Sequence, residues 1–99
     1  MTEKETIMSY QVKPNDLQYQ YTWTRDKGDA LYSGKLDQVK VDKDEGYEVL
    51  YFIQKFLDEH KLSNVESALR VEYLIHQSTE IMRDKLKKFV YENWNNSNI

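Results

Sequence analysis

Two histidines and one glutamate come closest to forming a chemical site in this sequence. His60 and His76 are the only histidines, and Glu72 stands four residues before His76, on the same face of an expected helix. A metal site needs three or four ligands at suitable spacing, and these three residues are divided between two helices. We interpret His60 as an edge-of-core residue near a helix C-terminus, and Glu72 with His76 as an i,i+4 pair. The sequence therefore predicts no metal site and no cofactor.

Other catalytic patterns are missing from the sequence. There is no serine nucleophile motif and no pair of carboxylates at catalytic spacing, and three glycines are too few for a phosphate-binding loop. The chain has no cysteine, which rules out disulfides and thiolate chemistry. The acidic residues Asp37, Asp42, Asp44 and Glu45 lack the spacing of a calcium loop, and we interpret them as a solvated helix cap. We expect that the protein is not an enzyme.

Aromatic and basic side chains offer surfaces for binding instead. Tyr47 and Tyr51 lie one helical turn apart on a polar helix face, and exposed aromatics concentrate binding energy. As an alternative, an N-terminal aromatic segment covers both rings. The candidate partner-binding residues are Tyr47, Tyr51, Arg83, Lys87, Tyr91 and Trp94. The leading hypothesis is a small non-catalytic protein that binds another protein or itself.

The last predicted helix also suggests a second function, the binding of nucleic acid. Its basic residues fall in two groups: Arg83 and Lys87 lie beside Tyr91 and Trp94, and Lys85 and Lys88 lie on another side. A nucleic-acid surface gathers its cations to neutralise several phosphates together, so this division weighs against it. The net charge of −3 gives no general attraction to polyanions. A nucleic-acid-binding regulator that uses Arg83, Lys87, Tyr91 and Trp94 remains the alternative.

These surfaces are positioned by a central amphipathic helix over Gly46 to Lys61. Its apolar arc is broad enough to contact several neighbours and contains Val49, Leu50, Phe52, Ile53, Phe56, Leu57 and His60. Either Asp42 or Asp44 is expected to cap its first turn.

Two more helices are predicted after it. The pattern Ser63 to Glu66 is typical of a capping box, in which each side chain bonds the other's backbone N–H, and it starts a helix of about Asn64 to Gln77. Ser78 and Thr79 interrupt the periodicity, and a third helix is expected over about Thr79 to Trp94. Short connections favour compact packing of these helices.

The N-terminal third contains the best strand pattern. Apolar and polar residues alternate from Leu17 to Thr24, as in a half-buried strand, and 30–33 and 36–41 could return as further strands. Alternatively, 10–41 forms an extended arm that the tyrosines and Trp23 hold on the helices. The predicted fold class is mainly α, with an α+β arrangement as the alternative: a three-helix C-terminal core with an N-terminal strand, hairpin or extended arm.

The length and charge pattern predict one small domain. We expect disordered tails at 1–9 and 95–99 and a single globular domain over 10–94, because the ends lack an apolar period. The longest uncharged run has eight residues, Leu17 to Thr24, which is too short for a membrane span, and the N-terminus has no signal-peptide core. We expect a soluble protein of the cytoplasm, with no membrane partner.

One short stretch resembles known sequences. The run Glu45 to Leu50 (EGYEVL), with Asp16 to Tyr19 and Trp23 before it and Asn93-Trp94 after it, is similar to small uncharacterised bacterial proteins of prophages and other mobile elements. The resemblance implies a single-domain accessory protein and an extended stretch before the central helix, which weighs against the second and third strands. It implies no activity and no functional residue.

Overall fold

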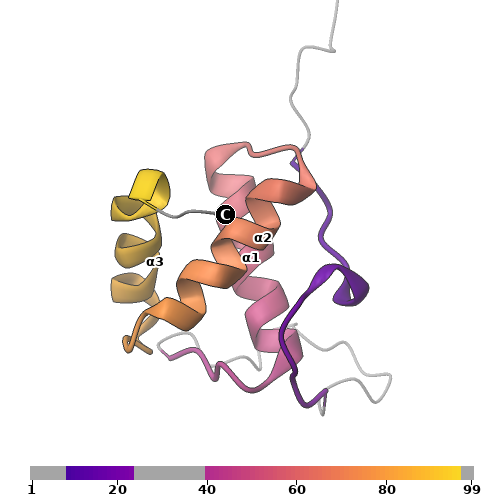
Figure 1. Ribbon diagram of the computed structural model, residues 1–99, viewed down its shortest axis with the longest axis vertical. Coiled ribbons are helices and arrows are strands. Elements are labelled where there is room, and N and C mark those ends of the chain that lie inside the picture. The colour runs from indigo at the N-terminus through magenta and orange to yellow at the C-terminus, as the bar shows by residue number, and fades with distance from the viewer. Residues whose placement is uncertain (1–8, 24–39, 97–99) are drawn as a thin grey trace, which may run out of the picture.

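The computed structural model describes residues 9–23 and 40–96, and this part of the chain is mainly helical. A 3-10 turn, η2 (Pro14–Asp16), precedes three helices, α1 (Gly46–His60), α2 (Val65–Gln77) and α3 (Arg83–Glu92), and a second 3-10 turn, η3 (Trp94–Asn96), follows them. In Figure 1, α2 crosses α1, α3 lies to one side of them, and the N-terminal segment runs along the other side. The predicted three-helix core is confirmed.

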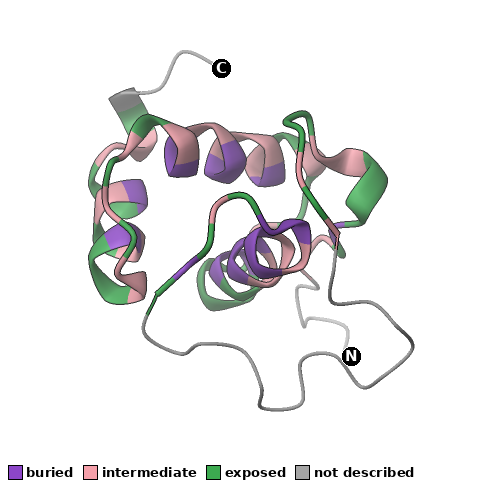
Figure 2. Ribbon diagram, turned by 90° about the horizontal axis from the view of Figure 1, so that it is seen from below, coloured by how far each residue is buried: buried purple, intermediate pink, exposed green. Residues whose placement is uncertain are grey.

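The core is built from the apolar faces that the helical periodicity predicted. The buried apolar residues of the helices are Val49, Phe52, Ile53, Phe56 and Leu57 on α1, Ala68, Val71, Leu74 and Ile75 on α2, and Leu86 and Val90 on α3. Figure 2 shows these buried faces turned toward one another. Because α1 contacts both α2 and the N-terminal segment, its buried face is broad. His60, which we placed at the edge of this face, is exposed.

The residues that cap α1 and α2 differ from the predicted ones. The Glu45 carboxylate, not Asp42 or Asp44, accepts from the Tyr47 N–H at 3.3 Å. Asp42 instead accepts from the Asp44 N–H with its Oδ1, at 3.0 Å, within the preceding turn.

Asn64 is the residue that caps α2. Its Oδ1 accepts from the Ser67 N–H and the Ser67 hydroxyl, each at 3.0 Å. The predicted Ser63–Glu66 capping box is therefore wrong by one residue, because the side chain at Ser63 lies outside the helix start.

The third helix begins at Arg83, four residues later than predicted from Thr79. Residues 78–82 pair with the segment before α1 instead: the Val41 N–H donates to the Ile81 carbonyl at 2.8 Å, and Lys40 forms an isolated β-bridge with Met82. The helix ends at Glu92 rather than Trp94, which opens η3. Of the predicted tail, Asn95 and Asn96 belong to η3, and 97–99 lie outside the described residues.

The predicted strand over Leu17–Thr24 is wrong for the residues that the structure describes, 17–23. They form an extended arm, and among the described residues its one ladder contact is an isolated parallel bridge between Thr22 and Glu45. No strand lies beside the arm within the described residues, so its backbone bonds elsewhere. The predicted returns at 30–33 and 36–41 lie outside the described residues, apart from Lys40 and Val41.

The arm is held along its length by helix side chains and caps. The Val12 N–H donates to the Gln54 side chain at 2.9 Å, and the Gln54 amide donates back to the Tyr10 carbonyl at 2.9 Å. The Gly46 N–H donates to the Thr22 carbonyl at 2.7 Å. A side chain at Gly46 would meet the Trp23 ring, because a Cβ there would lie 2.5 Å from the indole carbons. Glycine at the start of α1 therefore permits the arm to end against this helix.

Candidate functional site

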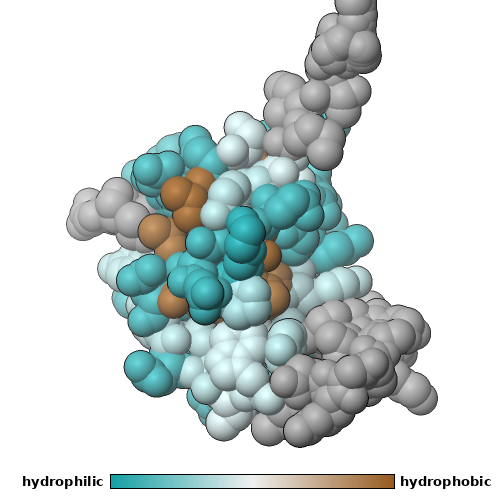
Figure 3. All heavy atoms as spheres, turned by 90° about the vertical axis from the view of Figure 1, so that its right-hand side faces the viewer, coloured by the Kyte–Doolittle hydropathy of each residue, from teal (hydrophilic) through white to brown (hydrophobic). Residues whose placement is uncertain are grey.

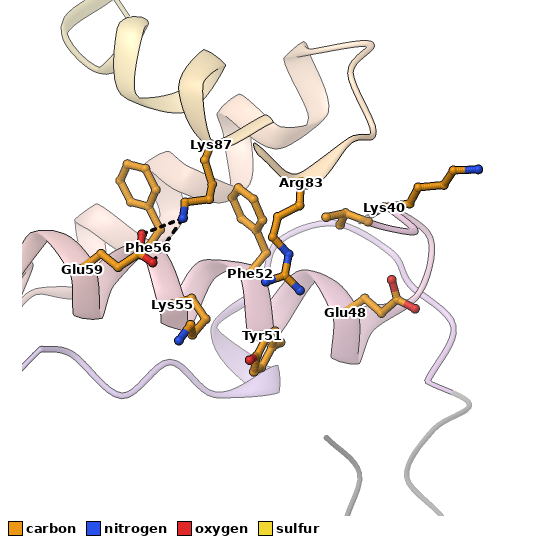
Figure 4. A pocket seen from close by; sticks show the side chains of 10 residues that line it. Lys40, Glu48, Tyr51, Phe52, Lys55, Phe56, Glu59, Arg83 and Lys87 are labelled. Carbon is orange, nitrogen blue, oxygen red and sulfur yellow. Dashed lines mark hydrogen bonds and ion pairs between the residues drawn. The ribbon is translucent and has the colours of Figure 1, made fainter. Parts of the chain in front are cut away.

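The main candidate site is a groove between α1 and α3. One row of α1 side chains, Glu48, Tyr51, Lys55 and Glu59, faces Arg83 and Lys87 of α3, and Lys40 lies at one end (Figure 4). We call this set of seven residues the α1–α3 groove. The Lys40–Met82 bridge explains why a residue before α1 lies beside the start of α3.

Three of the six candidate binding residues meet in this groove. The Arg83 guanidinium lies over the Tyr51 ring, 5.6 Å from its centroid, at a distance that suits a cation–π contact. Lys87 forms an ion pair with Glu59 at 3.1 Å. The helical spacing of Arg83 and Lys87 predicted that both lie on one side of α3, but no local pattern indicated that they would meet Tyr51.

The charge of the groove is opposite to that of the whole chain. Four basic side chains and two acidic ones line it, whereas the chain carries a net charge of −3. Sequence periodicity missed Lys40 and Lys55 as members of this basic surface, because they belong to other segments than α3. Beneath these side chains, Phe52 and Phe56 form a floor that is almost completely buried. The enclosed cavity measures about 20 Å³, which is room for one water molecule.

Tyr47 does not belong to the groove. Its ring is half-buried and makes an edge-to-face contact with Trp23, at 4.8 Å between centroids. The alternative in which the N-terminal arm covers the tyrosines is therefore correct for Tyr47. Tyr51 is also half-buried, but its recorded ring contact is with Arg83 of α3.

Tyr91 and Trp94 lie together in a second surface hollow, at the C-terminal ends of α1 and α3. The Trp94 ring stacks on Phe56 at 5.6 Å, and Tyr91 stacks on His60 at 5.7 Å. The Arg70 guanidinium lies 5.1 Å from the Trp94 ring centroid. Tyr91 is 64% exposed, and Trp94 is half-buried in these contacts. The six candidate residues thus separate into the groove, this aromatic cluster, and the covered Tyr47.

A buried carboxylate, Glu72, holds the arm on α2, although the sequence analysis considered this residue only as an i,i+4 partner of His76. Glu72 is 1% exposed. Its oxygens accept from the Gln18 N–H at 2.9 and 3.1 Å, from the Tyr19 N–H at 3.1 Å and from the Tyr21 hydroxyl at 2.7 Å. The available signal was its position: Glu72 lies four residues after Ala68 and three before Ile75, within the apolar stripe of α2.

His76 completes this cluster from the next turn of α2. Its Nε2 lies 2.8 Å from the Tyr21 oxygen, and its ring stacks on Tyr19 at 4.1 Å. Burial, followed by the hydrogen bond to Glu72, raises the pKa of the Tyr21 phenol, and burial lowers the pKa of His76 despite the nearby Glu72 carboxylate. A phenol kept neutral and a carboxylate occupied by three donor groups form a structural clamp for the arm.

Within residues 9–23 and 40–96, no three or more acidic or histidine side chains are placed to hold a metal ion. None of the helices in these ranges combines the length and apolar character needed to cross a bilayer. The surface shown in Figure 3, on the side of the arm, is mostly hydrophilic, with hydrophobic atoms confined to small patches. Broad apolar contact is therefore not a feature of that face.

Neither family models, curated proteins nor solved structures gave a match to this chain. The resemblance to small mobile-element proteins accordingly stays a prediction.

Proposed function

We propose that this protein is a small non-catalytic accessory protein that binds another protein through the α1–α3 groove. The observation that carries the proposal is the meeting of Tyr51, Arg83 and Lys87 with Lys55 on one face, from helices distant in the sequence. Arginine and tyrosine are enriched where protein interfaces gain most of their binding energy. Tyr51 and Arg83 also hold each other in place, which reduces the entropy that binding would cost.

The dimensions of the groove favour a macromolecular partner over a small molecule. Pockets for drug-sized ligands usually enclose about 300–1,000 Å³. The groove encloses about 20 Å³, with its side chains spread over the surface between two helices. A partner would therefore lie across the groove rather than enter it. Catalysis is also disfavoured, because the buried carboxylate of Glu72 is used to hold the arm.

Affinity capture with two matched charge reversals tests this proposal. The tagged protein, the double variant Arg83→Glu, Lys87→Glu and the control Lys85→Glu, Lys88→Glu are each expressed in the native host, and bound proteins are quantified. Both variants change the charge by the same amount on the same helix, but Lys85 and Lys88 are exposed outside the groove. We expect the first variant to lose its partner and the control to keep it, with both folded by circular dichroism.

Equal capture by both folded variants would show that the groove is not the binding surface. Light scattering of the purified protein distinguishes binding to another protein from self-association. A self-associating protein would show the mass of a dimer with no other protein present. A variant at Tyr91 or Trp94 that alone abolishes capture would move the site to the aromatic cluster.

A further inference from the structure

We propose that the hollow at the aromatic cluster binds an arginine side chain of a protein segment, with the guanidinium against the Tyr91 ring and paired with Glu92. This hollow lies at the C-terminal ends of α1 and α3, and it shares only the buried Phe56 with the α1–α3 groove. The inference therefore goes beyond the proposed function and does not depend on it.

Aromatic rings form most of the apolar surface of the hollow. It is lined by Phe56, His60, Tyr91 and Trp94, and Leu62 is the one aliphatic residue that joins them in the described part of the chain. The hollow measures about 490 Å³, within the range of about 300–1,000 Å³ found for ligand pockets. Because His60 and Tyr91 are exposed at its wall, it is open to solvent and does not enclose a whole small molecule. A side chain that extends from a larger partner fits these dimensions.

Tyr91 offers an accessible aromatic face in this hollow. It is 64% exposed, and its ring stacks on His60 with 5.7 Å between centroids and 25° between planes. The His60 ring lies in turn 4.3 Å from Phe56, so the Tyr91 ring is held against the end of α1 while much of it stays exposed. The Trp94 ring already contacts Phe56 and Arg70, and we therefore assign Trp94 to the wall of the hollow and not to the bound cation.

The charge of the hollow favours a cation. Glu92 is the charged side chain at its rim, and no lysine or arginine within 9–23 and 40–96 lines it. The face of a tyrosine ring attracts a cation that lies within about 6 Å of the ring centre. Glu92 is 4.0 Å from Lys88, with both side chains more than half exposed, and such an exposed pair contributes little. A guanidinium at hydrogen-bond distance would be a stronger partner for this carboxylate.

An arginine suits this arrangement better than a lysine does. A guanidinium is planar, so one face can lie on an aromatic ring while its edge donates hydrogen bonds to a carboxylate. Tyr91 and Glu92 are adjacent and exposed at the end of α3, and the exposed Asn95 adds an amide oxygen at the rim. Arg70 already makes a similar contact from outside the hollow, with its guanidinium 5.1 Å from the Trp94 ring centroid.

The same lining disfavours a nucleobase, which is another planar group that stacks on tyrosine. Sites for single-stranded nucleic acid combine aromatic rings with a positively charged path for the phosphates. In the part of the chain that the structure describes, the rim of the hollow presents the carboxylate of Glu92 instead. An arginine-bearing protein segment gains from this charge, whereas a phosphate backbone is repelled by it.

NMR titrations of the full-length protein with matched peptides test the inference. The blocked peptides share the sequence Gly-Gly-X-Gly-Gly, with arginine, lysine, leucine or citrulline at X, and citrulline has the shape of arginine without its charge. We expect the arginine peptide to shift the amide signals of Tyr91, Glu92 and Asn95 in a saturable way, with a Kd of about 1 mM or lower. The other three peptides should each bind at least about threefold more weakly.

Variants at exposed positions locate the contacts. Glu92→Gln should weaken binding of the arginine peptide at least about threefold, because it removes the negative charge. Tyr91→Leu should weaken it about two- to fivefold through loss of the aromatic face, whereas Tyr91→Phe should bind as the wild type does. Asp84→Asn is the matched control, because it removes an exposed carboxylate of α3 outside the hollow and should leave binding unchanged. Circular dichroism checks that each variant is folded.

Several results would overturn the inference. The arginine assignment fails if any of the other three peptides binds as tightly, or if Glu92→Gln and Tyr91→Leu both keep the wild-type affinity. An oligonucleotide that displaces the peptide and depends on Tyr91 would assign the hollow to nucleic acid. A dimer mass that Tyr91→Leu abolishes would assign it to a second copy of the chain. Peptide binding that appears only after removal of residues 97–99 would assign it to the chain's own C-terminus.

The two proposals fail independently. Tyr91 and Glu92 lie outside the α1–α3 groove, so loss of the arginine site leaves the capture experiment on Arg83 and Lys87 as it stands. Equal capture by the groove variants, in turn, would not alter the expected titrations.

Discussion

Replacement of Glu72 by glutamine should loosen the N-terminal arm. Glu72→Gln keeps the shape of the side chain but removes its charge and one acceptor. In the wild type, three donor groups, the Gln18 and Tyr19 N–H groups and the Tyr21 hydroxyl, bond to the carboxylate. If the glutamine oxygen takes the position of Oε2, its amide nitrogen must face the Gln18 N–H, which now lies 2.9 Å from Oε1.

The expected loss is a large share of the stability of a domain this small. Hydrogen bonds to a charged group contribute about 1.5–3 kcal/mol each, roughly twice as much as neutral ones. Reducing three such bonds to neutral strength predicts a loss of about 2–4 kcal/mol, out of the roughly 5–15 kcal/mol typical of small proteins. Release of the arm into water limits the loss, because its backbone can then bond to solvent.

Urea unfolding and amide exchange together test this prediction. Urea titration followed by circular dichroism gives the free energy of unfolding, and the Gln18 and Tyr19 amides should exchange faster in Glu72→Gln than in the wild type. Glu66→Gln is the matched control on the exposed side of the same helix, with an expected change within about ±0.5 kcal/mol. The clamp would be refuted if Glu72→Gln also changed the free energy of unfolding by no more than about 0.5 kcal/mol and left amide exchange at Gln18 and Tyr19 unaltered.

Three further predictions concern the core, the arm and pH. Ile53→Ala, at a fully buried position, should lower the free energy of unfolding, measured by urea titration, by about 2–5 kcal/mol. A loss below about 1 kcal/mol would contradict the burial of Ile53 in the core. Tyr47→Ala should cost about 1 kcal/mol and increase the exposure of Trp23 to fluorescence quenchers, because the two rings are in contact; unchanged quenching would argue against the contact. The raised pKa of Tyr21 keeps its phenol protonated in the folded protein while the unfolded chain ionises, so stability present below pH of about 10 should decline above it. Tyr21→Phe should decline less steeply, since only Tyr10 and Tyr19 then have raised pKa values of the same sign among the described residues, and an identical decline would contradict this.

Helix periodicity was the most reliable guide to this fold, because burial of one face is a property of the helix itself. The apolar arc of α1 was predicted from spacing alone, and its residues are buried apart from Leu50, which is half-buried, and His60, which is exposed. The helix ends and caps depended instead on which of several possible hydrogen-bond partners each residue meets in the fold. Asn64 rather than Ser63 caps α2, and pairing of Val41 with Ile81 keeps 78–82 extended although the pattern favoured a helix. Such outcomes depend on partners that a local pattern does not contain.

The alternating Leu17–Thr24 pattern shows the same limit at larger scale. Alternation reports that one side of an extended segment is covered, and it does not report what covers it. Here the partners are helix side chains, Gln54 and Glu72, rather than another strand. Glu72 within the apolar stripe of α2 was the one sequence signal for this arrangement.

The candidate site was predictable in part. Tyr51, Arg83 and Lys87 were selected by residue type and exposure, and they meet in the α1–α3 groove. Lys40 and Lys55 join them only through the packing of α1 against α3 and the bridge to Met82, which no single helix pattern could reveal. Tyr91 and Trp94 were grouped with Arg83 and Lys87 because they share α3 and its end, yet they line a separate hollow.

Site-specific photo-cross-linking in the native host tests the central claim, that a partner protein contacts the α1–α3 groove. A benzophenone amino acid is placed at Lys55, within the groove, and in a second variant at Lys85, which is exposed on α3 outside it. After irradiation, the account predicts a discrete heavier adduct from position 55 and none from position 85. An adduct from position 85 alone, or no adduct from position 55 in a folded protein at native levels, would contradict it.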